Sequence, residues 1–449
     1  MQHIADAAAA LASGRISAEA LVDAALDRIA DSTGEGSRAF TAVHAEAARA
    51  EARAMDGLRH IGRAPSPWAG IPVTVKDLFD EHGHPTPAGS TVLRGAPAAR
   101  SDAPAVARLR RAGFVVVGRT NMVEFAFSGL GVNPHYGTPR SPWDRRTGRL
   151  PGGSSSGAAV AAADHMGFGG LGTDTGGSCR VPAALCGVVG YKPTARRVPL
   201  AGVLPLAPSL DSVGPLARSV ACCALLDAII AGEENPHPVV RQPLAGLRLG
   251  LPRRTFLTDD IDTVVGNAFQ RALSRLAAAG ARIELFDIPE LAEIPAANAS
   301  GGFAASEAWA WHRGLVGAKA AGYDPRILAR IRRGERMSAA EYIDLVAARG
   351  RIMAAVARRT AAFDAVVTPT CPIIPPAIAE VDDEAAYNRI NMLLLRNTMV
   401  GNFLDRCSIS LPILLPGEAP VGLMLTGETM ADAALFRTAA AVEAALAEG

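Results

Sequence analysis

The sequence predicts an α/β fold in which a large mixed, mostly parallel twisted β-sheet is sandwiched between helices. Hydrophobic residues make up 49% of the 449 residues and aromatic residues only 5%. Such a core of Ala, Val, Leu and Ile suits strands covered by alanine-rich helices. Short apolar runs alternate with helical patterns, which indicates strand-helix-strand crossovers. The length allows two domains or one large unit, and we favour a single domain over residues 1–449.

The first 66 residues are predicted to form an N-terminal helical segment. Ser17 suits a helix N-cap, and the apolar residues from Leu21 to Ile29 recur at helical spacing. The proline-rich stretch Pro65–Pro67 ends this segment.

Residues 67–230 are predicted to form the core of the sheet. Residues 71–76 read as a short buried strand, and Lys76 stands at its carboxyl end, where open α/β sheets place functional groups. A helix over 103–112 and a strand over 114–118 complete a crossover. A short alanine helix over 158–163 follows a serine run, and its N-terminus favours negative charge. A loop over 209–215 then leads into another helix that reaches Ile230.

In the second half of the chain, strands and helices again alternate on both sides of a long helical, arginine-rich region. Residues 292–361 form that region, which we expect to form a lid or the substrate entrance. The remaining elements are predicted as strands over 247–251, 281–286, 363–369 and 421–425 and helices over 264–278 and 430–447.

Charge and composition exclude several classes of function. The net charge is +1 and no basic patch occurs, which argues against nucleic-acid binding. No apolar stretch reaches membrane-spanning length, and Asp6 interrupts the first alanine run, so we expect no signal peptide and a cytoplasmic location. The cysteines lack metal-type spacing, and so few thiols in a long chain indicate a reducing compartment; they stand at 179, 186, 222, 223, 371 and 407.

Two glycine-serine runs, Gly152–Gly157 and Gly172–Arg180, carry the strongest chemical signal. Glycine beside serine lets the backbone approach a substrate carbonyl, and successive NH groups can face a developing oxyanion. Acyl hydrolysis is therefore the first hypothesis. The candidate bases are few, because only Lys76, Lys192 and Lys319 are lysines among the 45 Lys and Arg residues, and arginine does not give up its proton. A codon bias toward arginine would also leave few lysines.

Two generic patterns are weaker. Residues 153–157 fit the G-x-S-x-G nucleophile elbow, but that motif requires a downstream histidine, typically near the C-terminus, and the last histidine is His312. A covalent label on Ser155 would favour this alternative. Residues 167–172 fit G-x-G-x-x-G, yet they follow an alanine-rich helix and do not open a helix after a strand. Dinucleotide binding is therefore disfavoured.

A larger set of ordered motifs resembles the amidase signature family. The resemblance runs from about Ile16 to the C-terminus and rests on residues 70–77, 152–157, 172–182 and 187–194, with later echoes at 209–215, 368–369 and 420–423. It implies a single amidase domain over 1–449, with a catalytic core at 67–230.

The resemblance also implies a Ser-cis-Ser-Lys triad. Ser178 would be the nucleophile, Ser154 the bridging cis-serine and Lys76 the base. A serine hydroxyl needs a base, and burial lowers the pKa of a lysine enough to make it one. Residues 71–75 supply an apolar setting for Lys76, whereas Lys192 fits a strand-end turn.

The other site residues surround this triad. The NH groups suited to an oxyanion hole belong to Thr175, Gly176, Gly177 and Ser178. Supporting roles fall to Ser155, Asp174 and Arg180. An ordinary surface ion pair is the alternative for Asp174 and Arg180. Ser156 is predicted to cap the following helix, and Cys179 to be a small packing residue.

The substrate side is less defined. By family analogy Phe125, Phe127 and Ser128 would line the substrate pocket, although an aromatic pair at this spacing can also be simply buried. Family members cleave amides, anilides, ureas and carbamates. We expect a hydrolase for a neutral, fairly apolar amide, anilide or carbamate, without cofactor or metal, which acts as a monomer or homodimer. The alternatives are a glutamine-hydrolysing subunit of a tRNA-dependent amidotransferase and a non-catalytic binding module.

Overall fold

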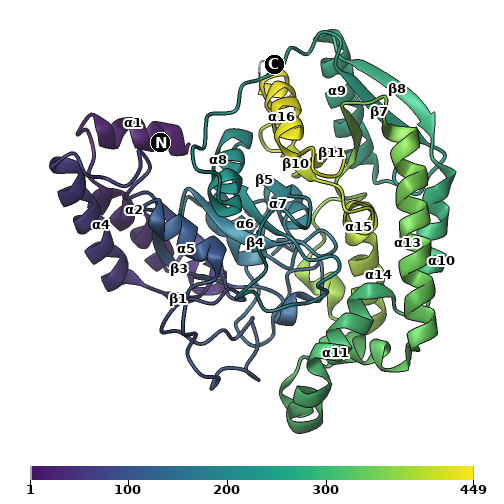
Figure 1. The fold of residues 1–449 in the computed structure, drawn as a ribbon, viewed down its shortest axis with the longest axis horizontal. Helices are drawn as coiled ribbons and strands as arrows, with labels where there is room; N and C mark the ends of the chain where they lie inside the picture. The colour runs from purple at the N-terminus through teal and green to yellow at the C-terminus, as the bar shows by residue number, and fades with distance from the viewer. Residues whose placement is uncertain (1–2, 448–449) are drawn as a thin grey trace.

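A computed structural model describes residues 3–447, which fold around one 11-stranded sheet (Figure 1). The strands follow the spatial order β1-β3-β2-β4-β6-β5-β10-β11-β9-β7-β8. Their bounds are β1 Phe40–Val43, β2 Pro72–Lys76, β3 Val115–Thr120, β4 Gly169–Thr173, β5 Val189–Lys192, β6 Val213–Ala217, β7 Arg248–Arg253, β8 Arg282–Asp287, β9 Ala365–Pro369, β10 Ser408–Pro412 and β11 Gly422–Thr426.

The sheet is mixed, but the prediction that it is mostly parallel is wrong. Parallel pairing joins β2 to β3 and β4, and β7 to β8 and β9. The six other pairs are antiparallel: β1–β3, β4–β6, β5–β6, β5–β10, β10–β11 and β9–β11. The predicted crossovers do form parallel strands near the two ends of the sheet. The middle strands return through hairpins and loops, which permit antiparallel pairing without a crossover helix.

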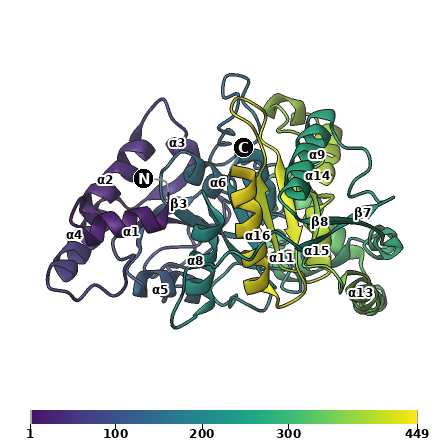
Figure 2. The ribbon, with the colours of Figure 1, turned by 90° about the horizontal axis from the view of Figure 1, so that it is seen from above.

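Helices cover both faces of the sheet. Gly190 of β5 lies against Cys179 and Ala183 at the start of α7 (Arg180–Cys186), while the next residue, Tyr191, packs on Phe436 of α16 (Asp432–Ala447). Since neighbouring strand residues point to opposite faces, α7 and α16 lie on opposite sides. Contacts place α6 beside α7 and α8 beside α16, and Figure 2 shows α6 and α8 on the two sides. The predicted sandwich is therefore confirmed.

The helices begin and end close to the predicted positions. Ser17 caps α2 by accepting from the NH of Ala20, as predicted. The longer helices are α1 Ile4–Ala12, α2 Ala18–Ala30, α4 Ala45–His60, α5 Pro104–Arg111, α6 Ser156–Ala163, α8 Val220–Ala231, α9 Thr263–Ala278, α11 Gly302–Lys319, α12 Pro325–Arg333, α13 Ala339–Thr360, α14 Glu384–Leu395 and α16 Asp432–Ala447. Shorter ones are α3 Gly36–Ala39, α7 Arg180–Cys186, α10 Glu293–Ala297 and α15 Thr398–Phe403.

Two segments differ from the sequence expectation. The predicted loop over 209–215 ends in strand β6, and the glycine-rich run at 167–172 is largely strand β4. These strands were not predicted because they contain Pro215 and several glycines, and proline and glycine are uncommon inside sheets. Pro215 lies beyond the two β6 residues that pair with β5, where β6 pairs with β4 alone.

The helical region at 292–361 is present and consists mainly of α10 to α13. Helix α13 runs along one edge of the molecule, at the opposite end from α1, α2 and α4 (Figure 1). Among residues 3–447, no helix combines the length and the apolar character needed to cross a membrane.

Candidate active site

Lys76 ends strand β2 inside the protein. Its side chain is fully buried, as are Ile71, Val73 and Val75 before it. Its Nζ donates to Ser154 Oγ at 2.8 Å and to Thr173 Oγ1 at 2.8 Å. Thr173 ends β4, which lies parallel to β2, so the carboxyl ends of these two strands bring lysine and threonine together.

Burial changes the acidity of this lysine. Loss of solvent lowers the pKa of Lys76 from 10.5 to about 7, although the nearby carboxylates of Asp174 and Asp211 oppose the change. The neutral amine, which carries a lone pair that can accept a proton, is therefore well populated near neutral pH.

The two glycine-serine runs meet next to Lys76. The Gly153–Ser154 peptide is cis, as the family resemblance implied. The NH of Ser155 donates to the carbonyl of Ser178 at 3.3 Å, which ties one run to the other. The Ser178 hydroxyl makes no hydrogen bond to any residue in 3–447, and its residue is 5% exposed. Lys76 and Ser154 are thus in contact, and the hydroxyl of Ser178 is unengaged.

The turn before Ser178 presents unused backbone donors. Within the described chain, the NH groups of Thr175, Gly176, Gly177 and Ser178 have no hydrogen-bond partner. Gly177 has φ +138°, and a Cβ there would lie 2.1 Å from Thr398 Oγ1, so only glycine fits. Thr398 also donates to the Gly176 carbonyl at 2.7 Å, which holds the peptide in place. Free NH groups on a fixed turn are suited to stabilise an oxyanion.

A buried ion pair braces this turn. Arg180 Nε and Nη2 donate to the two carboxylate oxygens of Asp174 at 3.0 and 2.9 Å, and both residues are fully buried. The alternative of an ordinary surface pair is therefore wrong. Burial alone would raise the pKa of Asp174, but the charge and hydrogen bonds of Arg180 outweigh it and hold the pKa at about 2. Asn402 completes the arrangement by donating to Asp174 Oδ1 at 2.8 Å.

The 209–215 segment contributes a further brace. Thr175 Oγ1 donates to Asp211 Oδ1 at 2.5 Å, and Ser212 Oγ donates to the Asp174 carbonyl at 2.8 Å. Backbone hydrogen bonds also join Asp174 and Ser212 in both directions. The sequence flagged this segment as a motif, but it did not assign these two side chains a role.

The remaining residues of the runs have ordinary structural positions. Ser155 Oγ donates to the Thr173 carbonyl at 3.3 Å. Ser155 occupies the N-cap position of α6 without a side-chain cap, and the buried hydroxyl of Ser156 has no partner within residues 3–447, so the predicted Ser156 cap is wrong. Cys179 is buried, and loss of solvent raises the pKa of its thiol, which agrees with a packing residue.

The predicted pocket residues lie in one segment but face different neighbours. The Phe125 ring is buried against His312 and Tyr323, at centroid distances of 4.5 and 5.2 Å. Phe127 is partly exposed, and its carbonyl accepts from Arg330 at 3.2 Å. The Phe125 ring is therefore closed in by the helical region, which leaves Phe127 as the more accessible of the two.

Ser128 borders the same region. Its hydroxyl donates to Asn391 Oδ1 at 2.9 Å and is buried. A Cβ at the adjacent Gly129 would lie 2.9 Å from Leu395, and a Cβ at Gly176 would lie 3.9 Å from the same side chain. Leu395 of α14 thus lies between the Ser128 loop and the turn that carries Ser178.

Sequence reasoning missed several residues that hold this site. Thr173 could have been found, because it lies in the second glycine-serine run, directly before Asp174. Thr398 and Asn402 gave no signal, since they stand more than 200 residues from the turn that they contact. In the described part of the chain, no group of three or more His, Cys, Asp or Glu side chains could hold a metal ion.

A comparison with known protein families identifies the family to which this chain belongs. The model of the Amidase family matches residues 20–436, nearly the whole chain. The chain belongs to the amidase signature family. This amidase is 41% identical over 408 residues to the 2-amino-5-chloromuconic acid deaminase of Comamonas testosteroni, covering 90% of this chain and 87% of that protein. It is 34% identical over 484 aligned positions to a component of the glutamyl-tRNA(Gln) amidotransferase of Thermobifida fusca (strain YX), covering 98% and 95%.

Solved structures agree with the family. A crystal structure of an amidase superposes on this amidase with a TM-score of 0.88 and 32% identity, covering 99% of both chains. The peptide amidase of Stenotrophomonas maltophilia gives a TM-score of 0.80 and 27% identity, covering 98% and 96%. The predicted family, enzyme class and fold are confirmed, apart from the share of parallel strands.

Proposed function

We propose that this amidase hydrolyses the C–N bond of a small, neutral and fairly apolar amide, anilide or carbamate through an acyl-enzyme on Ser178. The observation that carries the proposal is the 2.8 Å contact between the buried Lys76 amine and Ser154 Oγ, with a lysine pKa near 7. A neutral amine joined to a hydroxyl is the arrangement that a proton relay needs.

The proposed reaction begins at the Ser178 hydroxyl. Its oxygen attacks the substrate carbonyl carbon while its proton passes to Ser154, whose own proton passes to Lys76. The oxyanion is held by the free NH groups between Thr175 and Ser178. The ammonium of Lys76 then returns a proton through Ser154 to the leaving nitrogen, and the C–N bond breaks. Water attacks the acyl-enzyme by the same relay and releases a carboxylic acid from an amide or anilide, or a carbonic acid monoester from a carbamate. Hydrogen bonds to the nucleophile commonly tighten only when substrate binds.

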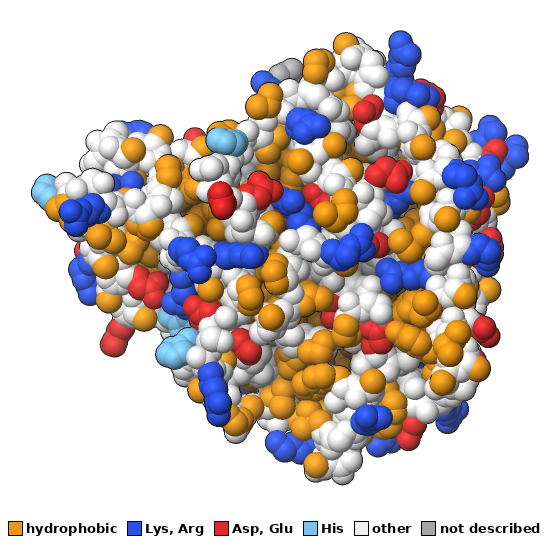
Figure 3. Space-filling view, viewed as in Figure 1, with side chains coloured by type: hydrophobic (Ala, Val, Ile, Leu, Met, Phe, Trp, Pro, Cys, Tyr) orange, Lys and Arg blue, Asp and Glu red, His pale blue; other side chains and the backbone are white. Residues whose placement is uncertain are grey.

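The preference for a neutral substrate follows from the charges around Ser178. Asp174 is neutralised by Arg180, and Lys76, with a pKa of about 7, is about half uncharged at pH 7. Helices α11 and α12 form the proposed entrance, supported by the packing of His312 and Tyr323 on Phe125. Hydrophobic side chains gather around a hollow beside α11 (Figure 3).

A second candidate is hydrolytic deamination of an unsaturated amino acid, the substrate class in the name of the Comamonas relative. Arg330 favours it, because this guanidinium contacts the Phe127 carbonyl and Asn388 and has no carboxylate partner within residues 3–447. It could pair with a substrate carboxylate.

The test is an activity screen combined with mapping of the covalent intermediate. Hexanamide, acetanilide, ethyl carbamate, glutamine and 2-aminomuconate would be compared by kcat/KM, and efficient glutamine hydrolysis would favour a role within an amidotransferase complex. A fluorophosphonate should add mass to Ser178, remain reactive with Ser155→Ala and fail with Ser178→Ala. Labelling of Ser155 would support the nucleophile elbow, and no labelling with no turnover would support a binding module.

A further inference from the structure

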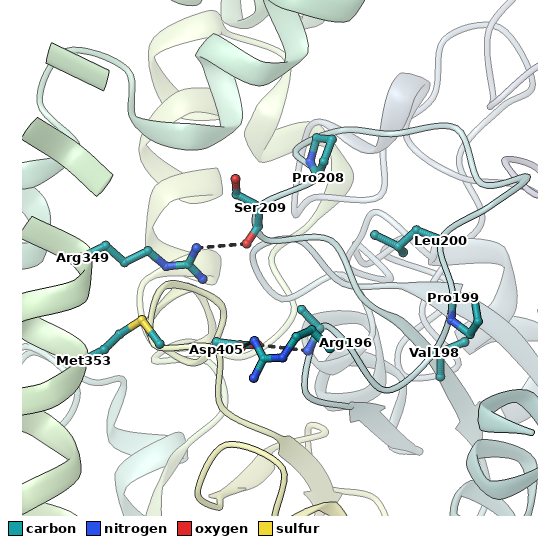
Figure 4. A pocket seen from close by; sticks show the side chains of 10 residues that line it. Arg196, Val198, Pro199, Leu200, Pro208, Ser209, Arg349, Met353 and Asp405 are labelled. Carbon is teal, nitrogen blue, oxygen red and sulfur yellow. Dashed lines mark hydrogen bonds and ion pairs between the residues drawn. The ribbon is translucent and has the colours of Figure 1, made fainter. Parts of the chain in front are cut away.

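A cavity of about 490 Å³ lies between α13 and the segments around residues 195–200 and 208–209. Figure 4 shows Arg349 and Met353 of α13 on one side and Leu200 on the other, with Arg196 and Asp405 between them. None of Lys76, Ser154 and Ser178 lines this cavity. Its walls are therefore formed by other residues than those of the candidate triad.

The two guanidinium groups that line the cavity differ in their partners. Arg196 pairs with Asp405 at 2.5 Å, which leaves these two residues neutral together. Arg349 has no ion-pair partner anywhere in residues 3–447. The charges of Asp405 and Glu307 act on Arg349 without an ion-pair contact, and the Glu307 carboxylate, which accepts from the neutral Tyr342 hydroxyl and the NH of Ser209, does not line the cavity. One guanidinium charge thus remains without a contacting carboxylate beside the cavity.

Arg349 still has donors to offer. Its Nε, Nη1 and Nη2 each donate one hydrogen bond, to the carbonyls of Phe403, Ser209 and Asn402 at 2.7, 3.1 and 3.2 Å. A guanidinium has five N–H groups, so two are left after these three bonds. The same bonds fix the side chain, which means that little conformational freedom would be lost when a ligand binds.

We propose that this cavity binds a small organic carboxylate whose apolar body lies on the walls formed by Val198, Leu200 and Met353. The volume falls in the range of small-molecule sites, and a guanidinium pairs with a carboxylate through charge-assisted hydrogen bonds. The apolar walls distinguish such a ligand from a bare inorganic anion. The concave shape favours a free small molecule over the side chain of a partner protein.

The test is direct binding to the purified full chain, with no need for turnover. Isothermal titration calorimetry on the full-length Ser178→Ala variant, which should not hydrolyse hexanamide, would compare hexanoate with hexanamide, which lacks the charge, and with inorganic phosphate, which lacks the apolar body. Hexanoate is expected to bind at least about tenfold more tightly than either. Equal binding of hexanamide would overturn the role of Arg349, and equal binding of phosphate would overturn the role of the apolar walls. Failure of hexanoate to bind at millimolar concentration would overturn the site.

A matched pair of variants assigns the binding to this cavity. Met353 lies one helical turn after Arg349, so Met353→Glu places a tethered carboxylate where the ligand would sit. Met353→Gln has the same shape without the charge. Hexanoate affinity is expected to fall at least about tenfold in Met353→Glu and to stay within about threefold in Met353→Gln. Equal affinity in wild type and Met353→Glu would show that hexanoate binds elsewhere, for instance at Ser178, and would refute the proposal. Circular dichroism would verify that both variants fold.

Discussion

Two strand ends carry a buried lysine, and the two lysines differ in the groups that they contact. Lys76 ends β2 and Lys192 ends β5, and both are fully buried. Burial lowers the pKa of Lys76 to about 7; burial, reinforced by the charge of Arg180, lowers that of Lys192 to about 8. Lys192 Nζ donates to the Pro193 carbonyl at 2.6 Å, whereas Lys76 contacts two hydroxyls. A carbonyl has no proton to pass on, so a lowered pKa without a hydroxyl partner does not create a relay.

Replacing each lysine by methionine should give the largest difference in activity between the two sites. Lys76→Met should reduce kcat/KM for the best amide by about 10²- to 10⁴-fold, the usual contribution of a general base. Lys192→Met should stay within about tenfold of wild type, because Lys192 has no proton path to Ser178. Equal losses in two folded variants would remove the distinction between the two lysines.

The pH dependence of kcat/KM should also distinguish the two lysines. A base acts in its deprotonated form, so kcat/KM should rise about tenfold per pH unit below pH 7 and level off above it, as Lys76 loses its proton. Lys192→Met should retain this profile. The rate would be measured from pH 5 to 9 at constant ionic strength, and a profile that moves when Lys192 is replaced would assign the titration to the wrong lysine.

Removing the hydroxyl of Thr173, the second hydroxyl that Lys76 contacts, should have a smaller effect on kcat. Thr173→Val preserves the shape but removes the oxygen that accepts from Nζ at 2.8 Å. The amine would then be less well oriented toward Ser154, and we expect kcat to fall about 3- to 30-fold with KM little changed. Thr173→Ser, which restores a hydroxyl, serves as the control and should recover most of the rate. A change in KM alone would indicate a role in substrate binding.

The pH dependence of Tm should show the free-energy cost of burying each lysine amine. The folded pKa lies below the unfolded value near 10.5, so the unfolded chain binds more protons between these two values and stability rises with pH there. Lys76→Met should therefore raise Tm most below pH 7, and the gain should shrink between about pH 7 and 10.5. For Lys192→Met the gain should shrink between about pH 8 and 10.5. Calorimetry at matched scan rates would measure both, and a gain independent of pH would contradict the lowered pKa values.

The sequence revealed the parts of the site that are local. Lys76 stands at the end of an apolar strand, and Ser154 and Ser178 lie in glycine runs, so their chemistry and family resemblance are visible over a few residues. Thr398 and Asn402 could not be found this way. They lie in an ordinary helical stretch, and their role exists only because α15 packs against a turn more than 200 residues earlier.

The strands of the sheet also differ in whether local sequence patterns predict them. Crossovers through α5 and α9 follow from local periodicity, and their strands are parallel as expected. Strand β6 contains Gly214 and Pro215, and β10 has serines at alternate positions, so neither has a strong strand signal. Their antiparallel pairing is decided by tertiary contacts, which a pattern of single residues does not encode.

The hydrogen bonds from Thr398 and Asn402 to the turn around Asp174 also constrain when the enzyme can become active during synthesis. At the usual pace of about 5 to 20 residues per second, a ribosome that has just completed Ser178 must translate for roughly ten seconds or more before α15 exists. Until then the Asp174–Arg180 pair lacks Asn402, and the turn lacks its last support. Ser178, the proposed nucleophile, therefore lies in an incomplete site on the nascent chain, and the proposed catalytic centre is complete only when almost the entire polypeptide has been synthesised.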